Sequence, residues 1–201
     1  DAEHIYITAC GTSWHAALIG SYILEELLNV PVKVEYASEF RYRVTAVNSN
    51  SVVICVSQSG ETADTLAAIR KAKEKGALTL GIVNVVGSSI SRETHCGVYI
   101  HAGPEIGVAS TKAFTSQVTI FNLIGLLLAD KKSINAEIYH SLMNDLERMP
   151  QLVQSVLDHG NDVSDIAQDF VNFSNFLYLG RGYQFPVALE GALKLKEISY
   201  I

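Results

Sequence analysis

The sequence predicts an α/β fold in three layers, a parallel sheet with helices on both faces, and two observations lead to this prediction. First, short apolar runs rich in Val and Ile alternate along the chain with longer segments of helical character. Second, the apolar runs are nearly continuous, which is typical of strands that are buried on both faces. A chain that alternates strand and helix in this way builds a parallel sheet covered by helices.

The individual elements follow from the apolar runs and from the segments between them. Apolar runs of four to eight residues predict strands, and longer periodic segments that end at Gly or Asn predict helices. The expected strands are residues 4–8, 32–36, 51–56, 78–84 and 97–100. The expected helices are about 14–28, 37–42, 66–75 and 111–129.

The order of patterns divides the chain into three expected parts. Residues 1–132 form the core of a first domain. Residues 133–175 form helices that close or link this domain, because Ile138, Leu142 and Leu146 recur at helical spacing. Residues 176–201 are expected to be the first strand and helix of a second, truncated domain of the same kind. This last expectation comes from a repeat at a shift of 171, in which, for example, Gly182 takes the place of Gly11.

Charge and hydropathy argue against two classes of partner. The net charge is −6 and Lys and Arg form no cluster, which argues against a nucleic-acid partner. The longest apolar stretch, residues 118–129, contains three polar or glycine positions and is too short to span a bilayer. We therefore expect no membrane segment. Only Lys112 is charged within the helix 111–129, so this helix is expected to bury a homodimer interface as well as one face of the sheet.

The cysteines and histidines give no sign of a metal or of a bound cofactor. Cys10, Cys55 and Cys96 are odd in number and lack C-x-x-C spacing, which favours a reducing, cytoplasmic setting. His95 and His101 lie near Cys96, but they do not complete a convincing set of metal ligands. Neither a Walker A loop nor a G-x-G-x-x-G motif is present. We expect neither a metal nor a cofactor.

The strand 51–56 runs directly into a turn that is rich in hydroxyl groups. Ser57, Gln58, Ser59 and Thr62 supply neutral donors, and Gly60 lets the backbone approach a ligand closely. The following helix begins with unpaired N–H groups and a dipole that favours an anion. This chemistry fits a phosphate monoester that is bound reversibly. The alternative is a helix N-cap with a capping acid, for which one serine would be enough.

Two further turns carry hydroxyl groups after other strands. Thr12 and Ser13 follow the first strand, and Ser110 lies in the turn 107–111 after the fifth. Because ligands of open parallel sheets bind beyond the carboxyl ends of the strands, the three turns are expected to converge. A phosphate that bears several hydroxyl groups, a sugar phosphate, is the predicted ligand.

Five motifs together resemble a known family. The turn at 57–65 is similar to that of the broad sugar-isomerase (SIS) domain family. The remaining motifs narrow the resemblance to the isomerase half of the glucosamine-6-phosphate synthases, also called glutamine–fructose-6-phosphate aminotransferases. The motifs occur in the family's order, at residues 10–13, 37–43, 57–65, 105–115 and 188–200.

The resemblance implies an activity and a set of partners. The family makes glucosamine-6-phosphate from fructose-6-phosphate, the first step of hexosamine and UDP-N-acetylglucosamine synthesis. Its ammonia comes from glutamine in a separate glutaminase domain, which is absent from this sequence, and its members are homodimers. The lysine that forms a Schiff base with the sugar is also absent here.

The resemblance also implies residue roles. Glu197 is the base that moves a proton between two sugar carbons, and Lys194 assists it. These two residues are three apart on a helix, where a surface salt bridge would be the ordinary interpretation. We also expect Glu197 to be poorly fixed, four residues from the end of the chain. By the resemblance, the phosphate is bound by Ser13, Ser57, Gln58, Ser59 and Thr62, with Thr12 beside them. The sugar is contacted by Val108 and Ser110.

A function of another class stays open. A non-catalytic SIS domain that senses a sugar phosphate and regulates a partner would carry the same serine-rich turn. We would not expect such a sensor to carry the 105–115 motif or the segment with Lys194 and Glu197.

Overall fold

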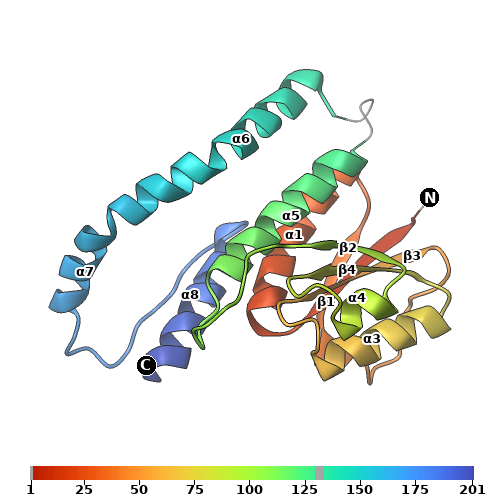
Figure 1. Ribbon diagram of the computed structural model, residues 1–201, viewed down its shortest axis with the longest axis horizontal. Helices are drawn as coiled ribbons and strands as arrows, with labels where there is room; N and C mark the ends of the chain where they lie inside the picture. Colours follow the sequence, from red (N-terminus) through yellow and green to blue (C-terminus); the bar gives the residue numbers. More distant parts are fainter. Residues whose placement is uncertain (1, 130–133) are drawn as a thin grey trace.

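The protein is built around a five-stranded parallel sheet with the order β2-β1-β3-β4-β5 (Figure 1). The computed structural model describes residues 2–129 and 134–201. The order of the strands reverses between β1 and β3, which both lie at the centre of the sheet and pair along their length. The strands are β1 (His4–Ala9), β2 (Val32–Tyr36), β3 (Ser51–Ser57), β4 (Leu78–Val83) and β5 (Cys96–Tyr99).

Helices cover both faces of the sheet, so the predicted three-layer α/β fold is confirmed. On one face, α1 (Gly11–Leu28) and α5 (Lys112–Leu128) pack on a cluster of buried Ile, Val and Ala side chains. On the other face, a second buried cluster lies under α2 (Ala37–Phe40), α3 (Ala63–Glu74) and α4 (Ser89–Glu93). Strand side chains alternate between the two clusters, as the period of a strand requires.

Two glycines bring α1 and α5 close together. A Cβ atom added at Gly20 of α1 would lie 2.5 Å from the ring of Phe121 on α5, and Phe121 itself is fully buried. A Cβ atom at Gly125 of α5 would lie 2.7 Å from the side chain of Leu27. Larger residues at either glycine would push the helices apart. This close packing holds the C-terminal halves of α1 and α5 against each other.

Two helices begin earlier than the sequence predicts. Helix α1 begins at Gly11 instead of about residue 14, because Gly11 adopts a positive φ of 55° that lets the chain turn directly from β1 into the helix. Helix α3 likewise begins at Ala63. The short helix α4 was not predicted, since five residues are too few to show a helical period.

Two amphipathic helices follow the first domain, α6 (Ala136–Asp158) and α7 (Gly160–Asp169). The predicted helices therefore form, but neither of them buries a residue. Figure 1 shows α6 running away from the sheet. The apolar faces of these helices are not buried against the first domain, and the expectation that the helices close or link this domain stays a prediction. The expected boundary at residues 132 and 133 lies outside the described residues.

Helix α8 (Gln184–Ser199) forms as predicted, whereas the strand expected before it does not. Residues 173–181 have no regular structure, because a strand needs a hydrogen-bonded neighbour and no described strand lies beside this segment.

Helix α8 packs against α1: the hydroxyl of Tyr183 donates to Glu26 at 2.7 Å, and the Tyr183 ring meets Tyr22 edge-on. Glu197 itself is exposed and lies near the C-terminal end of α8, and the expectation that it is poorly fixed stays a prediction. The division of the chain into three parts stays a prediction.

Among the residues that the structure describes, no helix is both long and apolar enough to cross a membrane.

Candidate functional site

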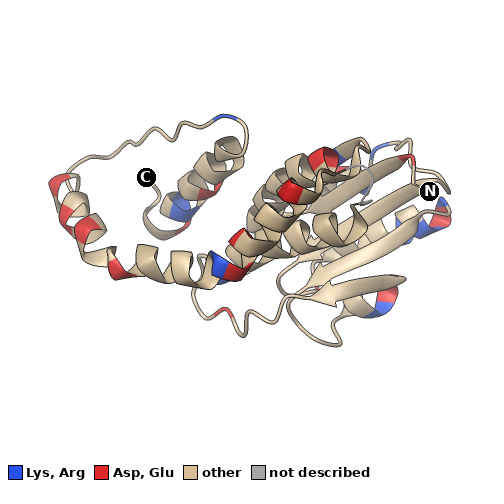
Figure 2. Cartoon of the chain, turned by 90° about the horizontal axis from the view of Figure 1, so that it is seen from above, with Lys and Arg blue, Asp and Glu red and all other residues tan. Residues whose placement is uncertain are grey.

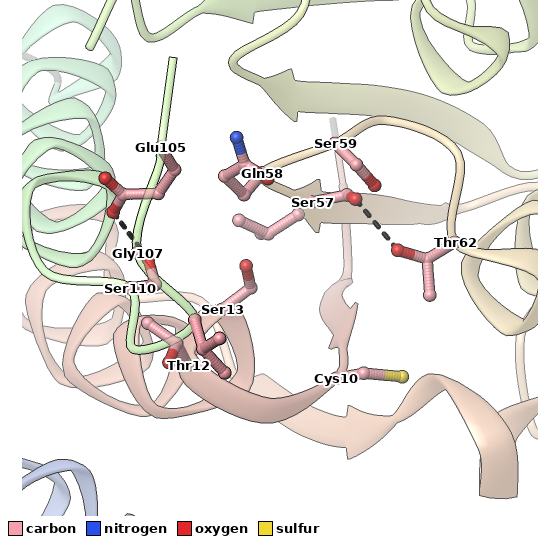
Figure 3. A pocket seen from close by; sticks show the side chains of 12 residues that line it. Cys10, Thr12, Ser13, Ser57, Gln58, Ser59, Thr62, Glu105, Gly107 and Ser110 are labelled. Carbon is pink, nitrogen blue, oxygen red and sulfur yellow. Dashed lines mark hydrogen bonds between the residues drawn. The ribbon is translucent and has the colours of Figure 1, made fainter. Parts of the chain in front are cut away.

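A pocket of about 280 Å³ lies at the carboxyl ends of β1 and β3, where the strand order reverses (Figure 3). This is the position at which open parallel sheets bind ligands. The pocket collects side chains from three segments that are far apart in the sequence. It is lined by Cys10, Thr12, Ser13, Val56, Ser57, Gln58, Ser59, Thr62, Glu105, Gly107, Val108 and Ser110.

The turn after β3 is held by its own hydroxyl groups. The backbone N–H of Gly60 donates to Oγ of Ser57 at 3.0 Å, and the same Oγ lies 3.0 Å from the hydroxyl of Thr62. Gly60 has a φ of 70°, a conformation that other residues adopt at a cost. The side chain of Ser57 is buried, while Gln58 is half-buried and Ser59 is exposed. The turn is therefore a preformed loop with its remaining donors directed at the pocket.

The alternative explanation of this turn as a helix cap does not hold. Thr62 is the N-cap residue of α3, yet its side chain makes no capping hydrogen bond. The neighbouring acid, Glu61, accepts a hydrogen bond from the N–H of Ser89 at 2.8 Å. The side chain of Ser89, and then its N–H, lower the pKa of the Glu61 carboxyl. Glu61 thus serves α4 and not α3. The first turn of α3 keeps its N–H groups and its dipole for an anion.

The turn after β1 adds two hydroxyl groups from the first turn of α1. Ser13 is buried, and its Oγ accepts a hydrogen bond from the side-chain amide of Gln117 at 3.0 Å. Gln117 lies on α5, is fully buried and was not identified from the sequence. Its position in an apolar helix was the available signal, because a buried amide requires a partner. Gln117 holds the Ser13 side chain in place beneath the pocket.

The third segment brings a carboxylate that the sequence analysis also missed. One oxygen of Glu105 accepts from the hydroxyl of Ser110 at 2.9 Å and from the N–H groups of Thr111 at 2.9 Å and Ala113 at 3.3 Å. Burial raises the pKa of Glu105, but these hydrogen bonds and the charge of Lys112 outweigh it, so the pKa is lowered. Glu105 therefore caps α5 as an anion. It is the only charged residue among the described residues that line the pocket.

Two charged residues of α8 lie at the edge of the pocket. The Lys194 ammonium donates to the hydroxyl of Thr12 at 2.9 Å and lies 2.7 Å from a carboxylate oxygen of Glu197. The Lys194 side chain is only 18% exposed and that of Glu197 is 31% exposed. The pair is therefore more shielded than an ordinary surface salt bridge. Through Thr12, it is placed next to the hydroxyl-lined pocket.

The remaining features of the site are neutral. Partial burial raises the pKa of the Cys10 thiol, so the thiol stays protonated at neutral pH and is a poor nucleophile. Within the described ranges, no three His, Cys, Asp or Glu side chains are grouped as a metal site would require. Lys and Arg are scattered over separate elements and interleaved with acids (Figure 2). Neutral hydrogen-bond donors therefore dominate the chemistry of the pocket.

Comparison with known proteins agrees with this geometry. Residues 1–127 match the family model of the SIS domain. The chain belongs to the SIS domain family.

Relatives of this SIS domain chain are similar along its whole length. It is 58% identical over 200 residues to a glutamine–fructose-6-phosphate aminotransferase of Chlorobaculum tepidum, and 50% identical over 200 residues to that of Escherichia coli K12. These matches cover 100% and 99% of the chain, and in both cases 33% of the relative. The chain thus spans about a third of the length of the curated relatives it matches.

A solved structure shows the same arrangement as this SIS domain chain. The C-terminal domain of glucosamine-fructose-6-phosphate aminotransferase from Francisella tularensis superposes with a TM-score of 0.95 at 42% identity. The superposition covers 100% of this chain and 57% of that one.

The fold of this SIS domain brings the predicted site residues together. The eight predicted substrate contacts line one pocket. Of the two predicted catalytic residues, Lys194 contacts Thr12 of that pocket, and Glu197 contacts Lys194. Their roles stay predictions. The eight are Thr12, Ser13, Ser57, Gln58, Ser59, Thr62, Val108 and Ser110.

Proposed function

We propose that this chain is the sugar-phosphate-binding part of the isomerase half of a glutamine–fructose-6-phosphate aminotransferase. The observation that carries the proposal is the pocket itself, in which three hydroxyl-bearing turns meet beside the Lys194–Glu197 pair. The similarity along the whole chain to aminotransferases of that name supports the choice of substrate. On this proposal, the pocket takes fructose-6-phosphate and the enzyme releases glucosamine-6-phosphate.

The phosphate binds at the N-terminus of α3. Ser57, Ser59 and Thr62 supply hydroxyl donors, and the uncapped first turn of α3 supplies backbone N–H groups. No Lys or Arg of the described residues lines the pocket, so the phosphate is bound by dipoles and hydrogen bonds alone. Hydrogen bonds to a charged phosphate are shorter and roughly twice as strong as those between neutral groups. Gln58 and Ser13 complete the set of donors.

The sugar extends from the phosphate toward the 105–110 segment and α8. Ser110 and the backbone of Val108 contact its hydroxyl groups. Glu105 repels a second anion, because its ionised carboxylate lies on this side of the pocket. The site is therefore suited to a sugar with one phosphate group, bound in one direction.

The isomerisation is a proton transfer by Glu197. Once ammonia has condensed at C2 of the open-chain sugar with loss of water, the carboxylate takes a proton from C1 and returns it to C2. The C1 hydroxyl gives its proton to the nitrogen on C2, so that C1 becomes the aldehyde carbon and C2 carries the amino group. A base must lie within about 3 Å of the proton that it moves. Lys194 holds the carboxylate in position at 2.7 Å and places a positive charge where negative charge develops during the transfer.

Other partners follow from the same proposal. Ammonia comes from glutamine in a glutaminase domain of the full-length enzyme, and the enzyme works in the cytoplasm as a homodimer. A dimer interface on α5 is supported by three of its leucines that stay exposed, Leu123, Leu127 and Leu128.

The test uses the full-length enzyme with glutamine and fructose-6-phosphate. We expect glucosamine-6-phosphate to form, and turnover to fall to background in Glu197→Gln. Ser59→Ala combined with Thr62→Ala should weaken sugar-phosphate affinity about tenfold or more, since each lost hydrogen bond to a charged group is worth about 1.5–3 kcal/mol. Binding of fructose-6-phosphate without any turnover by the full-length enzyme would favour a sensor instead.

Residues 1–201 alone should bind the sugar phosphate without turning it over. The three binding turns lie within this chain, but the Schiff-base lysine and the ammonia source do not. Calorimetry and an assay with fructose-6-phosphate and an ammonium salt test the two halves of this statement. Turnover by these residues that disappears in Glu197→Gln would contradict it.

A further inference from the structure

Glu190 occupies an unusual place on α8, one helical turn before Lys194. Its side chain is buried against the first turn of α1, and the residue is only 6% exposed. One carboxylate oxygen lies 2.6 Å from Nδ1 of His15, and the other accepts from the hydroxyl of Thr12 at 2.9 Å. His15 is itself buried, at 7% exposure. Both oxygens of Glu190 are therefore held by α1 side chains at least 175 residues away in the chain.

The same carboxylate also faces Lys194. The oxygen of Glu190 that is bound to Thr12 lies 3.3 Å from the Lys194 ammonium. That ammonium is surrounded by three oxygens, from Glu190, Thr12 and Glu197. A continuous set of contacts thus runs from His15 through Glu190 and Lys194 to Glu197. Of the described residues in this network, only Thr12 lines the pocket.

We propose that Glu190, held by His15, is a positioning residue that sets Lys194, and through it Glu197, at the edge of the sugar-phosphate pocket. The inference rests on the proposed function, since it assigns to Glu190 the placement of the pair that acts there. Glu190 does not line the pocket and needs no contact with substrate.

Physical reasons favour a positioning role. A lysine side chain has many rotamers of similar energy, so its ammonium stays in one place only where fixed acceptors hold it. A buried carboxylate is costly unless it is fully paired, so Glu190 has one favourable position, between His15, Thr12 and Lys194. This requirement fixes both the rotation and the axial position of α8 on α1. Without the contacts of Glu190, the start of α8 would still be held by the Tyr183–Glu26 hydrogen bond, but the C-terminal end of α8 would be free to shift.

The first test is Glu190→Gln in the full-length enzyme. Glutamine keeps the shape and one acceptor but removes the charge that faces Lys194. We expect kcat for glucosamine-6-phosphate formation to fall about 10–100-fold, since a misplacement of about 1 Å is worth up to about 10²-fold. KM for fructose-6-phosphate should change by less than about threefold, because, of the predicted substrate contacts, only Thr12 is hydrogen-bonded to Glu190, while Ser13 and the 57–62 turn are not.

A second pair of variants at His15 separates positioning from mere stability. Asn places an amide nitrogen near the position of Nδ1 and can still donate to Glu190, whereas Leu cannot. We expect His15→Asn to keep kcat within about threefold of wild type and His15→Leu to lower it about tenfold or more. Equal loss in both variants would assign His15 a role in packing alone.

Glu35→Gln is the matched control. Glu35 is also a buried glutamate, 7% exposed and ion-paired with Lys33 and Arg43, but it lies on the edge strand β2 outside the network. The same chemical change there should leave kcat unaltered. If Glu190→Gln and His15→Leu also leave kcat unaltered while the wild-type enzyme turns over, the positioning role is refuted.

A readout that does not depend on turnover separates this inference from the proposed function. Trace acylation with acetic anhydride, quantified at Lys194 by mass spectrometry, reports how tightly the ammonium is held. We expect Lys194 to be labelled faster in Glu190→Gln than in wild type, and unchanged in Glu35→Gln. If the wild type makes no glucosamine-6-phosphate, the proposed function fails, while faster labelling still supports the placement of Lys194. Unchanged labelling of Lys194 in Glu190→Gln overturns the positioning role of Glu190.

Discussion

Gly60→Ala is the most direct test of how the phosphate turn is built. Gly60 has a φ of 70°, and a Cβ atom there would lie closer than 3.0 Å to both Oγ and Cβ of Ser88. Rotating the Ser88 side chain moves its Oγ but leaves its Cβ in place, so the clash cannot be relieved by a rotamer change. The backbone of Gly60 is also tied to α4, since its carbonyl accepts from the N–H of Ile90 at 2.9 Å. The turn must therefore shift to accept the methyl group.

The expected cost has two parts. The left-handed conformation of a residue with a Cβ atom costs about 1–2 kcal/mol. Forcing a methyl group into a packed site costs about 1–3 kcal/mol more. We expect Gly60→Ala to lower the free energy of unfolding by the sum, roughly 2–5 kcal/mol. A displaced turn should also weaken fructose-6-phosphate binding about tenfold or more, the equivalent of one hydrogen bond to a charged group.

Urea unfolding and calorimetry measure the two effects, and Gly76→Ala is the control. Gly76 has a similar φ of 79°, but a Cβ atom there would meet its nearest neighbour, Ser49, at an ordinary 3.5 Å. Gly76→Ala should lower the free energy of unfolding only by the cost of the left-handed backbone, and it should leave fructose-6-phosphate binding unaltered. Ser88→Gly removes the side chain that clashes with the added methyl group, and glycine is tolerated at the N-cap position of α4. The double variant should therefore recover about 1–3 kcal/mol of the loss. If Gly60→Ala behaves like Gly76→Ala in both measurements, the close contact with Ser88 does not shape the turn.

Three further predictions concern single side chains. Glu105→Gln should lower the free energy of unfolding by about 0.5–2 kcal/mol at pH 7 through loss of the α5 cap. The pKa of Glu105 is lowered in the folded protein. In urea titrations, the difference in free energy of unfolding between wild type and Glu105→Gln should therefore shrink as the pH falls below the usual carboxyl pKa of about 4.3. A difference that stays constant with pH would contradict this. Ser13→Ala leaves the buried amide of Gln117 without its acceptor and should cost about 1–3 kcal/mol in the same assay, whereas no loss would mean that the amide has another partner. Complete burial raises the pKa of Cys55, so iodoacetamide at pH 8 should label exposed Cys96 in the folded protein and Cys55 only after unfolding; early labelling of Cys55 would show that the sheet opens.

The parts of the fold that local patterns encode were predicted from the sequence. The apolar run at 51–56 and the hydroxyl-rich turn after it predict a buried strand that leads into a ligand-binding turn, and the structure has both. The rule that parallel strands present their carboxyl ends at one edge was enough to bring 10–13, 57–62 and 107–111 into one pocket. The helical spacing of apolar residues in 136–158 predicted a helix correctly, although the spacing alone does not determine which surface the apolar face covers.

Tertiary structure alone decided which polar groups meet across the chain. Gln117 lies 104 residues from Ser13, and Glu190 lies 175 residues from His15, so no spacing in the sequence relates the members of either pair. The same holds for the extended segment before α8, where a strand pattern stayed unpaired because no strand of the described residues lies beside it. Periodicity and turn chemistry report the preferences of neighbouring residues, and these set the helices, the strands and the hydroxyl turns. Which buried donor finds which acceptor depends on how α1, α5 and α8 pack, and that is settled by the shape of the whole core.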